Sequence, residues 1–474
     1  MQTENLVWPI RNGWSFVIVL SSIALALPAF GARTIIGDFG GEIRETGARS
    51  DGNLHVDTQS TITRLAALHI NTYFFLIGPS SSDWDDFRNE FVPAAAKAGI
   101  DSWAYIKPPT ECTPTCSLPF GKDYVRWAQE VAGLSRSQSS VKGLVIDDFD
   151  ANADSFPPQY ANQIRQMGKS VNAKFLFYPL LYWTLGITSV GYFERYAQAM
   201  DGFIFAYRDE PYTNTISAEL IDNQLAAVEA KSSRYRKPFL LMVYCSPVQL
   251  DVPPPTPEYV QTVMTAGLQA IRAGKAEGVV TYLLDIHSSP YGSSANPAQH
   301  GNGYGIVMLT GKTAPGAYGE LNCRISVQPG LPSYALSFWH RSVAPVGIPK
   351  GVLSMEVIAG TTILWETDVA AGSSTWKSET VSVPSAVALA SKQPLRFVLA
   401  NATGANVRAT VYFDDLRPQG LSVDDPDFEN PTAWSSYRTN PAFRAAVQVF
   451  HQDQPQRLFG NLSTLYQKGI RRAQ

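Results

Sequence analysis

The chain has 474 residues, more than one ordinary hydrophobic core accommodates, so we expect two domains. Its formal net charge is −3 at pH 7, which excludes the strongly basic face of a nucleic-acid-binding protein. The 10 Trp and 21 Tyr suit a sugar-binding protein, but ordinary cores use the same rings, so this count decides nothing by itself.

The first 32 residues have the organisation of a secretory signal peptide. Arg11 supplies positive charge, residues 14–27 form an apolar run, and small residues follow up to Ala32. We therefore expect cleavage after Gly31 or Ala32, and a secreted or periplasmic protein that is not attached to a membrane afterwards. An uncleaved membrane anchor is the alternative, although the apolar run is short for a span.

Short apolar runs then alternate with amphipathic stretches eight times. This alternation predicts an α/β fold, a closed (β/α)₈ TIM barrel over residues 33–315. A doubly wound open sheet is the alternative, but no Gly-x-Gly-x-x-Gly follows the first strand. The expected strands are residues 34–42, 70–76, 100–107, 141–150, 174–179, 200–207, 238–244 and 278–285. The clearest helical stretches are residues 83–97, 157–170 and 216–234.

The sequence between the third and fourth strands contains Cys112-Thr-Pro-Thr-Cys116. In an exported protein this spacing favours a small disulfide loop. A metal site would need further ligands nearby, and only Glu111 is available. We expect a disulfide, with no metal and no other cofactor.

The fourth strand carries the sharpest change of polarity in the chain. The apolar residues 143–146 are followed directly by Asp147, Asp148 and Asp150. Two adjacent carboxylates in a confined place repel each other, which raises the pKa of one and leaves an acid beside an anion. Cleavage of a glycosidic bond requires such a pair. The alternative is a solvated turn that caps the next helix.

Polar residues just past the other strands would meet this pair, since the carboxyl ends of barrel strands form one rim. Taken singly, each is more typical of a salt bridge or a cap. Taken together, they suggest the carboxylate- and aromatic-rich pocket of a glycosidase. The rim residues are Asp38, Glu42, Lys107, Asp147, Asp148, Asp150, Tyr182, Asp209, Glu210, Tyr244, Asp251, Asp285 and His287.

Three short motifs, at residues 70–73, 143–150 and 175–182, resemble the catalytic domain of glycoside hydrolase family 84. This family contains the O-GlcNAcases and hyaluronidase-type β-N-acetylglucosaminidases. The resemblance implies substrate-assisted hydrolysis, in which the 2-acetamido oxygen of the sugar attacks C1. It assigns Asp147 to orient and polarise the acetamido N–H, and Asp148 to act as general acid and base.

The same resemblance implies the substrate-binding residues. Tyr182 would contact the acetamido group, while Tyr244 and Asp251 would correspond to the Trp and Asp that follow the seventh strand of the family. We also expect Gly40, Asp150 and Asp285 to line the sugar-binding rim. The chain lacks the Lys that the family has after its strand-two Asn-Thr-Tyr, which leaves the identity of the sugar open.

Two other functions stay open at this point. One is a retaining glycosidase in which Asp147 is the nucleophile and Asp209, Glu210 or Asp285 is the acid. The other is a barrel that binds glycans without cleaving them. Each implies a polysaccharide or glycoconjugate as the partner.

The pattern changes at about residue 320. Alternating strands separated by Gly, Pro and Ser predict an all-β, jelly-roll-like sandwich over residues 320–418. Its last strand, residues 409–416 with Phe-Asp-Asp-Leu, resembles that of carbohydrate-binding modules attached to secreted glycosidases. We expect residues 419–474 to be a tail with a candidate helix at 441–452.

Overall fold

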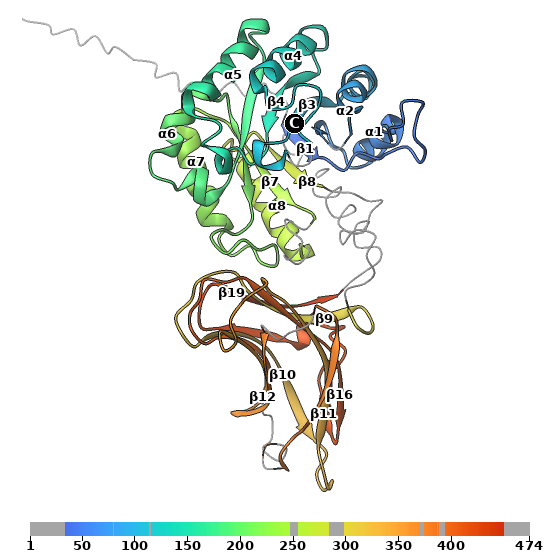
Figure 1. Ribbon diagram of the computed structural model, residues 1–474, viewed down its shortest axis with the longest axis vertical. Helices are drawn as coiled ribbons and strands as arrows, with labels where there is room; N and C mark the ends of the chain where they lie inside the picture. Colours follow the sequence, from blue (N-terminus) through green and yellow to red (C-terminus); the bar gives the residue numbers. More distant parts are fainter. Residues whose placement is uncertain are drawn as a thin grey trace, which may run out of the picture. The chain divides into compact units, whose positions relative to one another are not determined.

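Eight parallel strands close into a barrel in the computed structural model of the protein (Figure 1). The structure describes residues 34–449 except 79, 113–114, 247–254, 284–297, 370–373, 386 and 388–393. The predicted signal peptide lies outside the described residues. The predicted fold class, a TIM barrel followed by an all-β sandwich, is confirmed.

Each barrel strand is a short apolar segment that is buried on both faces, as parallel strands covered by helices must be. The barrel closes where β1 pairs with β8, for example Gly37 with Val280. The strands are β1 (Ile35–Phe39), β2 (Thr72–Ile77), β3 (Asp101–Ile106), β4 (Val141–Ile146), β5 (Leu176–Leu181), β6 (Phe203–Tyr207), β7 (Phe239–Tyr244) and β8 (Gly278–Tyr282).

Helices surround these strands (Figure 1). The predicted helix over 83–97 is helical throughout, with a π-helical segment at Asp86–Phe91 in its middle. No helix within the described part of the chain combines the length and apolar character needed to cross a bilayer. The helices are α1 (Thr58–Ala67), α2 (Asp83–Asp85), α3 (Val92–Lys97), α4 (Tyr124–Ser137), α5 (Pro158–Val171), α6 (Tyr192–Tyr196), α7 (Ile221–Tyr235) and α8 (Pro257–Arg272).

Helix α7 begins at Ile221, later than the predicted start at residue 216. The side-chain oxygen of Asn214 accepts the backbone N–H groups of Ile216 and Ser217, at 3.0 and 2.9 Å. Side-chain bonds of this kind compete with helix formation. They hold the chain in an irregular β6–α7 loop that carries several rim residues.

The C-terminal part is a sandwich of two antiparallel sheets, with Phe397 of one sheet 4.8 Å from Phe413 of the other. One sheet has the order β13-β12-β15-β10-β17, with β18 on β10, and the other β14-β11-β16-β9-β19. The strands are β9 (Gly303–Leu309), β10 (Ala317–Val327), β11 (Ala335–Val343), β12 (Leu353–Ala359), β13 (Thr362–Asp368), β14 (Lys377–Ser382), β15 (Pro394–Asn401), β16 (Ala409–Gln419), β17 (Leu421–Val423), β18 (Ser435–Arg438) and β19 (Phe443–Val449).

The candidate helix over residues 441–452 is wrong, because Phe443–Val449 forms strand β19. The chain alternates there, with Phe443 in the sandwich core and Ala445 and Val447 packed against it. This strand pairs with β9, which itself begins at Gly303, so the sheets extend on both sides of the predicted range 320–418.

The Phe-Asp-Asp-Leu motif anchors the chain that leads into the sandwich. The carboxylate of Asp414 accepts the backbone N–H groups of Gln299 and His300 at 2.5 and 3.0 Å, and a carboxylate oxygen of Asp415 lies 3.0 Å from Nδ1 of His300. Burial raises the pKa of Asp414 to about 7. This accounts structurally for the motif, and carbohydrate binding by the sandwich stays a prediction.

The predicted disulfide between Cys112 and Cys116 is confirmed. It closes a short loop between β3 and α4, directly after the turn that contains Glu111. The loop therefore sits at the rim on which the strand-end residues gather.

We expect Gly143→Ala to destabilise the barrel by roughly 3 kcal/mol or more. A Cβ on Gly143 would lie 1.9 Å from the carbonyl oxygen of Leu176 and 2.9 Å from the Trp103 ring, so β4 and β5 could not pair. Gly133→Ala is the matched control. It lies exposed in α4 with no atom within 4 Å of the added Cβ, and we expect it to stabilise by up to about 1 kcal/mol. Thermal and urea denaturation measure both, and equal stability of the two variants would contradict the close strand contact.

Candidate functional site

The strand end at β4 positions the two predicted catalytic carboxylates differently. Asp147 is the first residue after β4 and is 9% exposed, whereas Asp148 is more open and has a positive φ of 41°. Asp is one of the residues that tolerate this left-handed backbone conformation. The turn it creates lets two consecutive carboxyl groups take separate positions at the rim.

The Asp147 carboxyl group is held by two donors. Its Oδ1 accepts the hydroxyl of Tyr105 at 2.7 Å and the backbone N–H of Asp148 at 2.9 Å. Tyr105 lies on β3, one position before the strand ends. The sequence analysis did not predict Tyr105 as a site residue. Its position next to the carboxyl end of a barrel strand could have indicated that role.

The Asp148 carboxyl group is held from the other side. Its Oδ1 accepts the hydroxyl of Tyr182, which follows β5, at 2.5 Å. The hydroxyl of Tyr244, at the end of β7, is 3.4 Å from that of Tyr182. The structure therefore brings four predicted site residues together: Asp147, Asp148, Tyr182 and Tyr244.

Burial controls the electrostatics of this group. It raises the pKa of Asp147 well above the ordinary value, and the charges of Asp148 and Glu111 raise it further. Burial likewise raises the pKa values of Tyr105 and Tyr182, so both phenols stay protonated and act as donors. The raised pKa of Asp147 favours its protonated form, so one carboxyl group of the pair is the weaker acid, as the sequence analysis predicted.

Glu111 is a third carboxyl group at the rim, which sequence reasoning considered only as a metal ligand. It ends the short turn Pro109–Glu111 after β3. Partial burial and the negative charge of Asp148 raise its pKa, while Lys107 lowers it. The rim therefore has enough negative charge to favour retention of a proton near the Asp147–Asp148 pair.

Arg208 is a second residue that the sequence analysis missed. It follows β6 directly, and its guanidinium carbon lies 3.8 Å from the centre of the Tyr182 ring. Its Nε donates to Glu210 at 2.7 Å, and Glu210 in turn accepts the backbone N–H of Thr184 at 2.7 Å. Arg208 and Glu210 together fix the segment that presents the Tyr182 hydroxyl to Asp148.

Aromatic rings form the remaining wall of the site. The Tyr244 and Tyr282 rings are 4.7 Å apart, and the Phe39 ring is 5.1 Å from Tyr282 and 3.9 Å from Tyr105. Apolar ring faces next to carboxyl and hydroxyl groups suit a sugar, which has both C–H faces and polar edges. A carboxyl group that retains a proton at this rim can protonate an oxygen atom of a bound molecule.

Two predicted substrate-binding residues have roles within the protein. The buried Asp150 accepts the backbone N–H of Tyr182 at 2.7 Å, and its pKa is raised by burial to about 8. Gly40 donates its N–H to Phe74 at 3.2 Å and accepts the hydroxyl of Tyr73 at 2.8 Å, with a φ of 66°. Both residues therefore support the rim through contacts within the protein. The other Asp150 oxygen, Oδ1, is buried and has no hydrogen-bond partner among the described residues.

Several rim carboxylates are likewise engaged in the structure of the rim. Asp38 accepts the hydroxyl of Thr281 at 2.6 Å, and Glu42 accepts the backbone N–H of Leu76 at 2.9 Å. Asp209, considered as an alternative acid, is fully buried and bonded to Tyr207, Asn214, Leu220 and Arg444. Glu210 is held as described above. Asp251, Asp285 and His287 lie outside the described residues.

Among the described residues, His55, Asp86 and Glu90 have ligand atoms within 4.8 Å of one another, a composition that a metal could use. The His55 nitrogens already contact Asp86 at 2.6 Å and Asp51 at 3.0 Å, and Glu90 is paired with Arg49 at 2.6 Å. These partners give the cluster an internal role, and it does not contribute to the candidate site.

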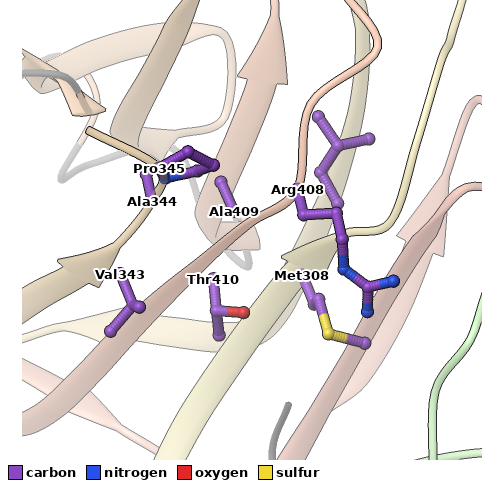
Figure 2. A pocket seen from close by; sticks show the side chains of 8 residues that line it. Met308, Val343, Ala344, Pro345, Arg408, Ala409 and Thr410 are labelled. Carbon is purple, nitrogen blue, oxygen red and sulfur yellow. The ribbon is translucent and has the colours of Figure 1, made fainter. Parts of the chain in front are cut away.

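A pocket of about 310 Å³ lies in the sandwich rather than in the barrel (Figure 2). Figure 2 shows a mostly apolar lining, in which Arg408 and the hydroxyl of Thr410 are the polar groups. The guanidinium of Arg408 donates to the carbonyl oxygen of Thr213 at 3.0 Å. The lining contains no carboxyl group and no imidazole beside the Thr410 hydroxyl.

No protein-family model matches the chain, and no curated protein matches it. Among solved structures, a calcium-binding mutant of Bacteroides uniformis beta-glucuronidase 2 aligns with a TM-score of 0.41 and 6% identity, over 80% of this chain and 64% of that one. The Ignisphaera aggregans GH53 catalytic domain aligns with a TM-score of 0.35 and 12% identity, over 54% and 86%. The endo-beta-N-acetylglucosaminidase from Cordyceps militaris aligns with a TM-score of 0.33 and 15% identity, over 54% and 82%. At these values the similarity says nothing about the activity of this chain.

We expect Asp150 to make the protein less stable as the pH rises. Its pKa is about 8 in the folded protein and near 4 when unfolded, so the folded form holds the proton more tightly. The stabilisation is complete below about pH 4 and is lost as the pH rises to about 8, by at most about 1.4 kcal/mol per pH unit. Asp150→Asn keeps an acceptor for Tyr182 but has no proton to lose. In urea titrations, the free energy of unfolding of Asp150→Asn minus that of wild type should therefore rise between about pH 4 and pH 8. A difference that does not change with pH would contradict this.

Proposed function

We propose that this protein is a glycoside hydrolase that cleaves N-acetylhexosaminides by substrate-assisted, retaining catalysis. The observation that carries the proposal is the Asp147–Asp148 pair at the end of β4, with each carboxyl group bonded to a different tyrosine hydroxyl. The motif resemblance described above assigns the same two residues. Aromatic rings beside the pair supply the apolar contact that a sugar ring needs.

In the proposed reaction the acetamido oxygen attacks C1 of the sugar while the bond from C1 to the leaving oxygen breaks. Asp148 gives its proton to that oxygen, and Asp147 accepts a hydrogen bond from the acetamido N–H, which becomes more acidic as the ring closes. Water then attacks C1 and gives a proton to Asp148, while the bond from C1 to the acetamido oxygen breaks and the acetamido group is restored. Because the acetamido group must attack from the opposite face, the leaving group is trans to it, as in β-glucosaminides.

The raised pKa of Asp147 favours the proton on the residue that is not the proposed acid, so the proposed roles require substrate binding to redistribute it. In the free protein, burial favours the neutral form of Asp147. A substrate N–H that donates to Asp147 would instead favour its ionised form, since hydrogen bonds to the charged form stabilise it. The proposed roles then require a proton on Asp148, on the oxygen that does not accept the Tyr182 hydroxyl. Substrate binding would thereby prepare the acid, as coupled titrating groups allow.

The direct alternative, with Asp147 as nucleophile, needs a separate acid. Asp209 and Glu210 are held by partners within the protein, which disfavours both. Glu111, whose pKa is raised and whose charge acts on Asp147, is a further described candidate. The experiments below separate this mechanism from the assisted one.

We also propose that the protein is exported. The N-terminal segment has the pattern of a signal peptide, and the Cys112–Cys116 disulfide suits an oxidising compartment. The substrate would then be an extracellular or periplasmic polysaccharide or glycoconjugate.

We expect the protein to hydrolyse 4-nitrophenyl N-acetyl-β-D-glucosaminide or its galacto isomer, but not the matching 2-hydroxy glucoside. The hydroxy substrate lacks the group that attacks C1. A thiazoline that mimics the cyclic intermediate should inhibit, and a 2-fluorosugar should label no residue in mass spectra. Efficient cleavage of the 2-hydroxy substrate, or a covalent adduct on Asp147, would disprove substrate assistance.

We expect Asp148→Asn to lower kcat about 10²–10⁴-fold on substrates with poor leaving groups, and much less on 4-nitrophenyl substrates, which do not need an acid. Asp147→Asn should lower kcat on both classes, because its role precedes departure of the leaving group. Asp154→Asn, an exposed change in the same loop, is the matched control and should retain wild-type rates. Equal losses for Asp148→Asn on both substrate classes would rule out the acid role.

A further inference from the structure

We propose that Arg444, on strand β19 of the sandwich, is a positioning residue for the barrel's active site. The barrel and the sandwich belong to one compact unit, Thr34–Gln474. Within it, the Arg444 guanidinium bonds to Asp209 of the β6–α7 loop at 2.8 Å. These residues are 235 positions apart in the chain. The kinetic part of the test below rests on the proposed function, whereas the hydrogen-exchange part does not.

Both partners of this pair are removed from solvent. The side chain of Asp209 is 0% exposed and that of Arg444 is 3% exposed. Arg444 also donates to the Ser217 hydroxyl at 3.0 Å and to the carbonyl oxygens of Pro441 and Phe443. Its donors are thus distributed between the strand on which it lies and the barrel loop that it contacts.

The other described hydrogen-bond partners of Asp209 are neutral. They are the Tyr207 hydroxyl at 2.9 Å, the Asn214 side-chain amide at 2.7 Å and the backbone N–H of Leu220 at 3.0 Å. A buried carboxylate requires a countercharge, and removing one partner of a buried pair leaves the other uncompensated. Arg444 supplies that charge, and so it holds Asp209 in its buried position with a φ of 54°.

The residues on either side of Asp209 contact the segment that contains Tyr182, which is bonded to the proposed acid. Arg208 lies over the Tyr182 ring, and Tyr182 donates to Asp148. Glu210 accepts the backbone N–H of Thr184, two positions after Tyr182. A shift of Asp209 would therefore move two of the contacts that hold this segment, beside the bond from the Tyr182 N–H to Asp150. The sandwich thus sets the position of the hydroxyl that holds the proposed acid.

The test compares Arg444→Met and Arg444→Lys with Arg438→Met in the full-length protein. Arg438 is the matched control, because it pairs with Glu219 of the same loop but that pair is partly exposed. Asp209→Asn is the second variant, in case Arg444→Met does not fold. Amide hydrogen exchange is measured at Thr184 and Leu220 well below each melting temperature, and kcat and KM are measured on the N-acetylhexosaminide that wild type cleaves.

We expect Arg444→Met to speed exchange at Thr184 and Leu220 at least tenfold, while amides of α4 stay at wild-type rates. It should lower kcat about 10–100-fold, with a smaller change in KM, since Arg444 touches no substrate. Arg444→Lys should restore part of both effects, and Arg438→Met should leave both unchanged. Asp209→Asn should resemble Arg444→Met.

Unchanged exchange at Thr184 and Leu220 in Arg444→Met would overturn the proposal, as would a uniform rise throughout the barrel, which reports only lost stability. Equal effects in Arg438→Met would also overturn it. If wild type cleaves no glycoside, the proposed function fails, but the exchange measurements still decide whether Arg444 positions the loop.

Discussion

The burial of the Asp147 carboxyl group at the end of β4 is the constraint on which the site depends. A carboxyl group in this position needs hydrogen-bond donors, because an unpaired buried polar group is costly. The neighbouring strands supply tyrosines, with Tyr105 from β3 bonded to Asp147 and Tyr182 after β5 bonded to Asp148. Side chains from three consecutive strands therefore share one small volume, and their charges and protons become interdependent.

The acids of the rim divide into two groups with different roles. Asp147 and Asp148 face the site, while Asp150 and Glu210 accept backbone N–H groups from the segment after β5. Those two bonds tie both ends of a short stretch that includes Tyr182. Negative charge at this rim thus serves structure as well as chemistry, and a count of carboxylates near strand ends overstates the number that can react.

The sandwich contributes more than a second core. Its motif residue Asp414 binds the chain that enters the domain, and Arg444 of β19 neutralises a buried aspartate in a barrel loop. Both interactions join segments that are far apart in sequence. Because ion pairs that are hidden from water are strongly distance-dependent, they set position more than they add stability. The geometry of the candidate site in the barrel can in this way depend on a strand near the end of the described chain.

The sequence by itself determined the barrel, since eight buried apolar runs alternating with amphipathic stretches have few other solutions. It also identified Asp147, Asp148, Tyr182 and Tyr244, because residues that follow parallel strands must meet at one rim. It could not assign partners. Whether a rim acid faces solvent or a backbone N–H depends on loop paths, and only the tertiary structure decided that Asp209 pairs with Arg444. Strand β19 was predicted as a helix for the same reason. Its alternating apolar residues indicate a strand only when the sandwich core against which they pack is known.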